Sequence, residues 1–307
     1  MPILERDAWR LQYFAGVDCP PDVVIPTDDP DCWLLYPDHR WIYDKLRVAE
    51  SQGLACGPHG VQPDSFPVFS KPMTNLKGMG VGSRVMREPS DLDEHYSPGH
   101  MWMDLLRGDH VSTDCAVVDG TIAWSRHATG LPWDDGMFKY WVIHAAASPW
   151  LEEYLGGWVS RHMRGYTGMM NFETIGGRII EAHLRFADQW CDLYGPGWTH
   201  SLVRLYAERT WDFADHDRRD GYSIPLFARH HARFRHPHPA HQAEIRSMPS
   251  VRSLQITFHE DRNPDDHPMP PGGFRLGIVN CTNLQDGMVA RRRLADAFPS
   301  GLVLHQD

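Results

Sequence analysis

The segment GMMNFETIGGRIIEAHLR (residues 168–185) holds acidic and basic side chains at spacings that suit a divalent cation and a phosphoryl group. Glu181 and His183 stand two residues apart, so on a β-strand they share one face. Glu173 precedes a Gly-Gly turn, which predicts a hairpin with Glu173 on the partner strand. Carboxylates on one face repel each other unless a cation lies between them, and such ligands suit Mg²⁺ or Mn²⁺ with nucleotide phosphates completing the shell. Arg185 continues the same face and is suited to clamping a transferred phosphoryl group.

The register of this hairpin decides whether Glu173 joins the other two ligands. A two-residue turn pairs Glu173 with Ile180 and puts it on the opposite face. A three-residue loop, residues 175–177, pairs Glu173 with Ile179 and aligns it with the other two ligands. The residues alone leave both registers open.

A second stretch, PVFSKPMTNLKGMGVGSRV (residues 67–85), has the composition of a phosphate-binding loop. A short strand delivers Lys71, and glycines then recur at alternate positions, Gly78, Gly80 and Gly82. Glycines so placed let backbone N–H groups approach a phosphate closely, and a lysine at the end of the strand adds a point charge. A mobile surface hairpin has a similar pattern, so this stretch indicates a phosphate site only in combination with the neighbouring segments.

Two further polar positions flank this loop in the chain. A helix predicted over residues 42–51 carries Asp44-Lys45, and a lysine on a helix is ordinarily solvated. Asp109 precedes the next predicted strand, where a carboxylate is able to accept hydrogen bonds from ribose hydroxyls.

In order and spacing, these segments resemble the ATP-grasp superfamily. The matching segments are Asp44-Lys45, residues 67–82, Met103–Asp109, Asn171–Glu173 and Ile180–Arg185, which together cover residues 41–190. The resemblance implies an α+β fold in which two α+β lobes grip ATP between antiparallel sheets. It also implies four parts: a shortened N-terminal segment (1–40), a small lobe with the glycine-rich loop (41–110), a large lobe with the metal site (111–190), and a C-terminal extension packed on the large lobe (191–307).

The resemblance implies how ATP binds. Lys45, Lys71 and the glycine-rich loop would hold the phosphates. Backbone groups of Asp104 and Leu106 would contact adenine, and Asp109 would bind the ribose.

The same resemblance assigns the metal ligands and the catalytic groups. Glu173 and Glu181 would hold Mg²⁺ or Mn²⁺, which favours the three-residue loop because both acidic positions face the nucleotide in the superfamily. His183 replaces the usual asparagine and is a poorer ligand for a hard cation, so Mn²⁺, a phosphate or no ligand at all stay open for it. Lys71 and Arg185 would be catalytic, with Arg185 stabilising the transition state.

The activity implied is that of an ADP-forming ligase, which activates a small-molecule carboxylate as an acyl phosphate for attack by an amine or a thiol. One alternative is a small-molecule kinase on the same scaffold. Another is an ATP-binding regulatory subunit, which the short N-terminal segment favours. A His/Asp metal hydrolase ranks last, because it rests on composition alone.

Candidate substrate residues lie outside the matched segments. Arg126, His127 and Lys139 follow a hairpin that Asp-Gly at 119–120 predicts, and Arg275 follows a Pro-Gly turn. The five histidines of residues 229–241 lack the helical i, i+4 pair common in zinc enzymes, so we expect a loop there.

Composition limits the classes of protein. Of 307 residues, 42% are hydrophobic and 23% charged, which suffices for a core and rules out general disorder. A net charge of −10 argues against nucleic acid as a partner, and no apolar run is long enough to span a membrane. The six scattered cysteines are expected to be reduced thiols of a cytoplasmic protein. The chain could act alone, as a homodimer or with a partner subunit.

Overall fold

The smaller of the two main sheets carries Lys71. A computed structural model of the chain describes residues 3–5, 7–76 and 78–304. Four antiparallel strands run in the order β3-β6-β4-β5, with Lys71 of β4 opposite Met101 of β6 on the face toward the rest of the molecule. Trp102 and Leu92 cover the other face. The elements are β3 (Cys56–Pro58), β4 (Val68–Pro72), β5 (Arg84–Met86), α4 (Pro89–Glu94) and β6 (His100–Asp104).

The larger sheet has eight strands in the order β11-β10-β7-β8-β9-β12-β14-β13, and every neighbouring pair is antiparallel. The Asp-Gly hairpin is confirmed, since Asp119 and Gly120 both have a positive φ, as a type I′ turn requires. The strands are β7 (His110–Val118), β8 (Thr121–Pro132), β9 (Phe138–Ile143), β10 (Gly168–Ile175), β11 (Arg178–His183), β12 (Gly221–Ala228), β13 (Val251–Ile256) and β14 (Phe274–Cys281).

The β10–β11 hairpin follows neither of the two registers expected from the sequence. Its turn has two residues, because Ile175 pairs with Arg178, so the expected three-residue loop is wrong. A bulge then shifts the register, and Glu173 pairs with Glu181 instead of with Ile180. The extra residue of a bulge moves every later side chain to the other face. The expected alignment of the two carboxylates is therefore present, but a bulge produces it rather than the turn.

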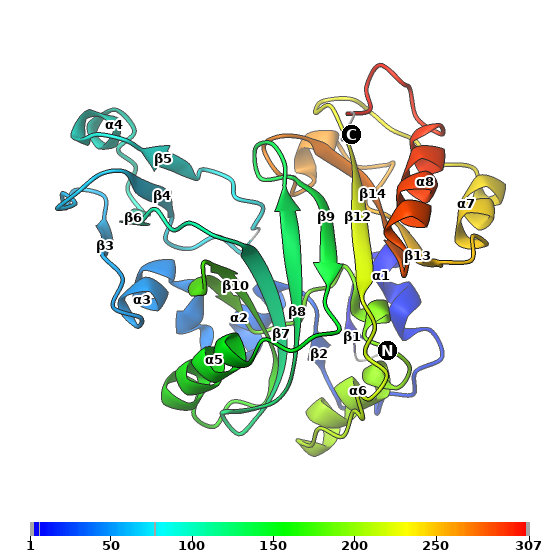
Figure 1. Ribbon diagram of the computed structural model, residues 1–307, viewed down its shortest axis with the longest axis horizontal. Coiled ribbons are helices and arrows are strands. Elements are labelled where there is room, and N and C mark those ends of the chain that lie inside the picture. The colour runs from blue at the N-terminus through cyan, green and yellow to red at the C-terminus, as the bar shows by residue number, and fades with distance from the viewer. Residues whose placement is uncertain (1–2, 6, 77, 305–307) are drawn as a thin grey trace.

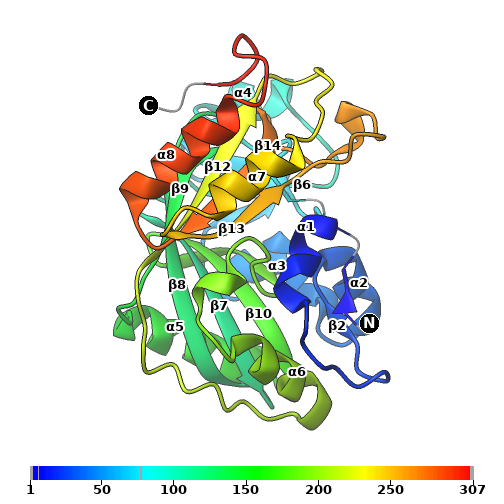
Figure 2. The same ribbon diagram turned by 90° about the vertical axis from the view of Figure 1, so that its right-hand side faces the viewer.

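Different helices cover the two faces of the large sheet (Figure 1). Trp158 of α5 packs against Phe172 on one face, and Trp198 of α6 packs in the cluster with Trp141 on the other. Figure 2 shows α7 and α8 lying together across β12–β14, where Leu294 and Ile245 fill a separate cluster. These helices are α5 (Pro149–His162), α6 (Trp198–Glu208), α7 (Pro239–Arg246) and α8 (Leu284–Ala295), with 3₁₀ turns at Cys191–Leu193 and Pro264–Asp266.

The first forty residues lie against the large sheet and do not form a sheet lobe of their own. Phe14 and Ile25 are buried in the same cluster as Trp198, and the Gln12 side-chain amide donates to the Leu254 carbonyl. A parallel pair, β1 (Ile3–Leu4) and β2 (Ile25–Pro26), holds the segment together, with α1 (Ala8–Leu11), a 3₁₀ turn (Gln12–Phe14) and α2 (Asp29–Leu35).

The whole arrangement confirms the α+β class. The four domain boundaries expected from the sequence stay a prediction, although β12 pairs with β9, so the C-terminal strands continue the sheet that holds β10 and β11. Among the described helices, none has the length and apolar character needed to cross a membrane.

Candidate active site

Lys45 reaches the large sheet from the start of a helix. The chain forms a 3₁₀ turn at Arg40–Tyr43, and α3 (Lys45–Glu50) begins after it rather than at residue 42. The reason is Asp44, whose carboxylate accepts from the N–H groups of Leu46 and Arg47 and so caps the helix. Lys45 is the first helical residue and is 7% exposed, and its Nζ lies 2.9 Å from Glu181 Oε1.

Lys71 reaches the same strand from the small sheet. Its Nζ donates to the Ile180 carbonyl oxygen at 2.7 Å, and the residue is 5% exposed. Burial and the nearby Lys45 ammonium lower the pKa of Lys71 to about 8. Two lysines from separate elements thus lie beside β11, where a polyphosphate would relieve their mutual repulsion.

Glu173 and Glu181 lie directly opposite each other, and a different side chain contacts each of them. His110 Nε2 on β7 lies 3.0 Å from Glu173 Oε2, and Lys45 pairs with Glu181. Burial acts to raise the pKa of Glu173, but the hydrogen bond and charge of His110 outweigh it and lower the pKa to about 2. Glu173 is therefore positioned as a carboxylate.

His183 and Arg185 meet a partner that the sequence did not reveal, Asp29 at the first position of α2. Asp29 Oδ2 lies 2.9 Å from His183 Nδ1 and 3.1 Å from Arg185 Nη2, and the Tyr43 hydroxyl donates to Asp29 Oδ1 at 3.1 Å. Burial acts to raise the pKa of Asp29, yet Arg185 and His183 hold it well below its usual range. Burial alone would lower the pKa of His183, but the Asp29 carboxylate outweighs burial, so the pKa of His183 is raised.

Asp29 and His110, which were not predicted as site residues, carry only weak signals in the sequence. Asp29 stands in an acidic run, TDDPD, that indicates only a helix start, and His110 precedes a strand like many polar residues. Both contacts join segments far apart in the chain, which a local pattern does not encode.

Apolar side chains pack together between the small sheet and β11. Met101, Met103, Leu106 and Ile180 belong to this one cluster. The Asp104 N–H already donates to the Ala55 carbonyl, so Leu106 has the better position of the two expected adenine contacts.

The glycine-rich loop joins β4 to β5 within the small sheet, and Asp109 lies between β6 and β7, where the chain passes from the small sheet to the large one. Gly78 and Gly80 have positive φ, and a Cβ on Gly136 of the β8–β9 turn would lie 3.5 Å from the Met79 carbonyl oxygen. The loop therefore extends from the small sheet to the large one. Asp109 is exposed, and its carbonyl accepts from the Gly176 N–H at the β10–β11 turn.

The four expected substrate residues do not converge. His127 lies on the far face of the sheet, bonded to Thr113 and facing Glu152 of α5. Arg126 is buried and paired with Asp215, and Lys139 lies in β9.

The Nε of Arg275 is completely buried and has no hydrogen-bond partner among the described residues; the Nε of Arg126 is the same in this respect, but Arg126 has Asp215 as an ion-pair partner. Burial lowers the pKa of Arg275 to about 10, with Asp188 and Arg10 as its charged neighbours.

The residues fit a divalent cation only with help from a ligand. Within the described residues, no three His, Cys, Asp or Glu side chains are gathered closely enough to hold a metal by themselves. One or two carboxylates plus substrate phosphates are, however, the usual ligand set of Mg²⁺ in kinases, ATPases and polymerases. Glu173, Glu181 and His183 are the residues that would supply the protein part of such a set.

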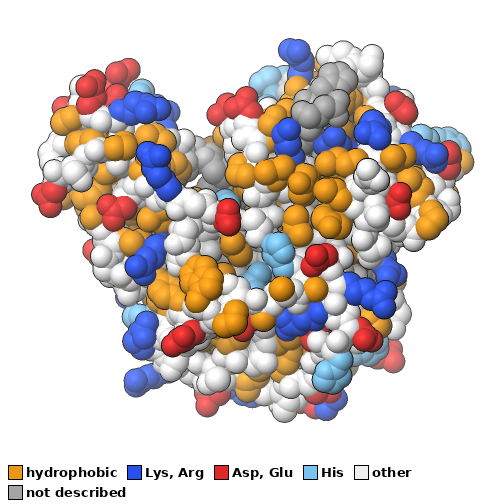
Figure 3. All heavy atoms as spheres, in the orientation of Figure 1, with side chains coloured by type: hydrophobic (Ala, Val, Ile, Leu, Met, Phe, Trp, Pro, Cys, Tyr) orange, Lys and Arg blue, Asp and Glu red, His pale blue; other side chains and the backbone are white. Residues whose placement is uncertain are grey.

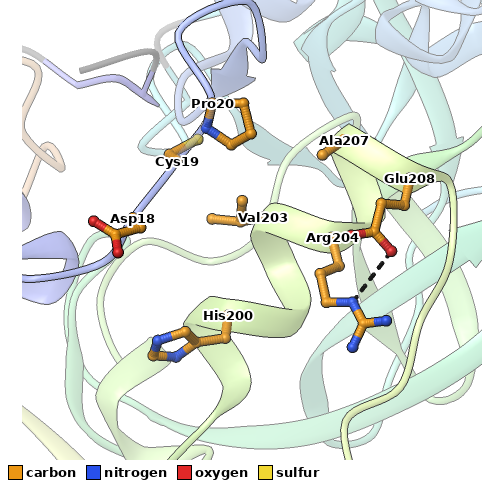
Figure 4. A pocket seen from close by; sticks show the side chains of 8 residues that line it. All are labelled: Asp18, Cys19, Pro20, His200, Val203, Arg204, Ala207 and Glu208. Atoms are coloured by element: carbon orange, nitrogen blue, oxygen red, sulfur yellow. Dashed lines mark hydrogen bonds and ion pairs between the residues drawn. The ribbon is translucent and has the colours of Figure 1, made fainter.

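Figure 3 shows a notch between the small lobe and the body of the molecule. A separate hollow of about 490 Å³ lies between residues 18–20 and α6 (Figure 4). Its charged side chains Arg204 and Glu208 pair with each other, and none of the expected site residues lines it.

Several solved structures share the fold of this chain. The L-amino acid ligase from Bacillus licheniformis aligns with a TM-score of 0.64 at 11% identity, over 97% of this chain and 84% of that one. The N5-carboxyaminoimidazole ribonucleotide synthetase from Thermus thermophilus gives 0.60 at 13%, over 94% and 84%. The biotin carboxylase–β,γ-ATP complex from Campylobacter jejuni gives 0.57 at 13%, over 92% and 75%. No protein-family model and no curated protein matches the chain.

The chain thus has two α+β lobes, each built on an antiparallel sheet, with charged side chains between them. The similarities above show that it shares the fold of these proteins, which confirms the ATP-grasp fold expected from the sequence.

The lowered pKa of Lys71 makes stability depend on pH. Between about pH 8 and pH 10.5 the unfolded chain binds more protons than the folded one, so the free energy of unfolding rises with pH there. Relative to Lys71→Met, the wild-type value should increase by roughly 2 kcal/mol from pH 7 to pH 10. Urea denaturation of both proteins across this range measures the difference, and a constant difference would contradict the buried, uncharged lysine at high pH.

Proposed function

We propose that this chain is an ADP-forming ligase, which uses ATP to activate a small-molecule carboxylate as an acyl phosphate for attack by an amine. The observation that carries the proposal is the meeting of Lys45, Lys71, Glu173 and Glu181, contributed by both sheets and the helix between them, beside the apolar cluster of Leu106 and Ile180. The similar structures are those of a ligase, a synthetase and a carboxylase bound to β,γ-ATP, which supports the same class.

In this proposal the protein positions charge and has no need of a side-chain nucleophile. The apolar side chains around Leu106 and Ile180 would contact the adenine, and Lys71 and Lys45 would neutralise the phosphates. Glu173 and Glu181 would hold Mg²⁺ or Mn²⁺, which supplies further charge neutralisation on the phosphates when bound. The glycine-rich loop, which passes close to Gly136 of the β8–β9 turn, would cover the phosphates and exclude water.

Arg185 lies beside the expected ligand His183, with Nη2 3.4 Å from His183 Nδ1, and its guanidinium is suited to the transferred phosphoryl group. Asp29 holds its guanidinium through Nη2, while Nη1 donates to the Phe186 carbonyl at 3.2 Å. A fixed guanidinium stabilises the charge of the transferring phosphoryl group without reorganisation during the reaction. This is the role that we assign to Arg185.

For the substrate carboxylate we propose Arg275. A buried guanidinium Nε without a hydrogen-bond partner is costly, and an anionic substrate would supply the missing partner. Asp188 is a shared neighbour of Arg275 and Arg185, which puts the two guanidinium groups in one region of the molecule.

The six cysteines are all free, which supports a reducing, cytoplasmic location as part of this proposal.

The products of ATP turnover test the proposed ligase activity. With a productive acid and amine, ADP and inorganic phosphate should appear in equal amounts, and Glu181→Gln should lower turnover at least 100-fold because a metal carboxylate is lost. A coupled ADP assay and a phosphate assay, run together on acid and amine libraries, measure both.

The matched control is Glu153→Gln, an exposed glutamate on α5. It should keep wild-type turnover. ADP without phosphate for every productive substrate would instead identify a kinase. Cellular function retained by Glu181→Gln without ATP turnover would identify a regulatory ATP-binding subunit.

Replacing Arg275 should weaken substrate binding without lowering stability. Arg275→Met should raise the KM for the acid at least tenfold and leave ATP affinity unchanged. Its thermal stability should stay equal or rise, because a buried Nε without a hydrogen-bond partner is removed. Steady-state kinetics and thermal melts measure this, with exposed Arg235→Met as control. A loss of stability with an unchanged KM would show that Arg275 is structural.

A further inference from the structure

His183 occupies a position between two carboxylates. Its Nδ1 lies 2.9 Å from Asp29 Oδ2, and its Nε2 lies 3.8 Å from Glu181 Oε1. Both His183 and Asp29 are almost completely buried, at 3% and 4% exposure. The imidazole therefore connects the N-terminal segment to the metal carboxylate of β11.

The contacts of Asp29 fix which nitrogen is free. A carboxylate only accepts hydrogen bonds, so His183 Nδ1 must donate to it. The Tyr43 hydroxyl and Arg185 Nη2 donate to the same carboxylate and hold it in place. Nε2 is then the nitrogen directed at Glu181, and it becomes a metal ligand once a cation displaces its proton.

The separation of the two donors fits a shared cation. With metal–ligand distances near 2.1 Å, two donors on one ion lie at most about 4.2 Å apart. His183 Nε2 and Glu181 Oε1, at 3.8 Å, are within that limit. Lys45 also contacts Glu181, so its ammonium would shift toward the phosphates when a cation binds.

We propose that His183, positioned by Asp29, is a nitrogen ligand of the metal–nucleotide site, and that the site therefore prefers a first-row transition ion such as Mn²⁺ to Mg²⁺. The inference rests on the proposed function. Mg²⁺ is a hard cation that favours oxygen and dehydrates reluctantly, whereas imidazole suits the first-row transition ions. Asp29 is a positioning residue in this account, since it contacts neither the nucleotide nor the metal.

Pulsed electron paramagnetic resonance of Mn²⁺ tests the nitrogen ligand directly. The sample is the full chain with Mn²⁺ and a non-hydrolysable ATP analogue. We expect a nitrogen coupling that changes when histidine is labelled with ¹⁵N, which requires no variant that might misfold. His183→Asn should abolish the coupling, and His110→Gln should retain it, because His110 is the other imidazole near these carboxylates.

Metal affinities test the preference and the role of Asp29. In titrations of Mn²⁺ and Mg²⁺ with the same analogue, His183→Asn should lower the Mn²⁺-over-Mg²⁺ preference at least tenfold. Asp29→Asn should weaken Mn²⁺ binding 10- to 100-fold, as loss of a carboxylate behind a ligating histidine does. The control is His231→Asn, whose side chain is 79% exposed and which should match the wild type.

The outcomes separate the inference from the proposed function. Nucleotide-dependent Mn²⁺ binding without histidine coupling, or with coupling that survives in His183→Asn, overturns the inference and leaves the ligase proposal standing. If neither Mn²⁺ nor Mg²⁺ binds with the analogue, the proposed function fails as well.

Discussion

The structure depends on two carboxylates held directly opposite each other on one hairpin. Glu173 and Glu181 form a cross-strand pair of like charges, an arrangement that destabilises a sheet unless cations compensate it. Lys45 contacts one and His110 the other. These contacts link α3 to β11 and β7 to β10, so the side chains that offset the repulsion also lie at the proposed site for a cation and a polyphosphate.

A second buried carboxylate links the N-terminal segment to this hairpin. Asp29 binds His183 and Arg185 and accepts a hydrogen bond from Tyr43. Removing one partner of such a network leaves an uncompensated buried charge. The first forty residues thus contribute a support for β11 rather than a lobe of their own, which gives the short segment a role in the site.

Part of the fold and site follows from the sequence for clear physical reasons. Asp119-Gly120 predicts its hairpin because both residues must adopt positive φ, and the glycine spacing after Lys71 predicts a loop, in which Gly78, Gly80 and Gly82 all have positive φ. The bulge beside Glu173 was not predictable, because a register shift depends on tertiary packing. Neither was the burial of Arg126 against Asp215, since their 89-residue separation leaves no local pattern.

Hydrogen exchange of the full chain, with and without a divalent cation and a non-hydrolysable ATP analogue, tests the central claim most directly. The claim is that the nucleotide binds between the small sheet and the β10–β11 hairpin. The account predicts new protection in the glycine-rich loop, in β6 and in β11 when the analogue binds. Protection confined to residues 18–20 and α6, around the separate hollow, would contradict it.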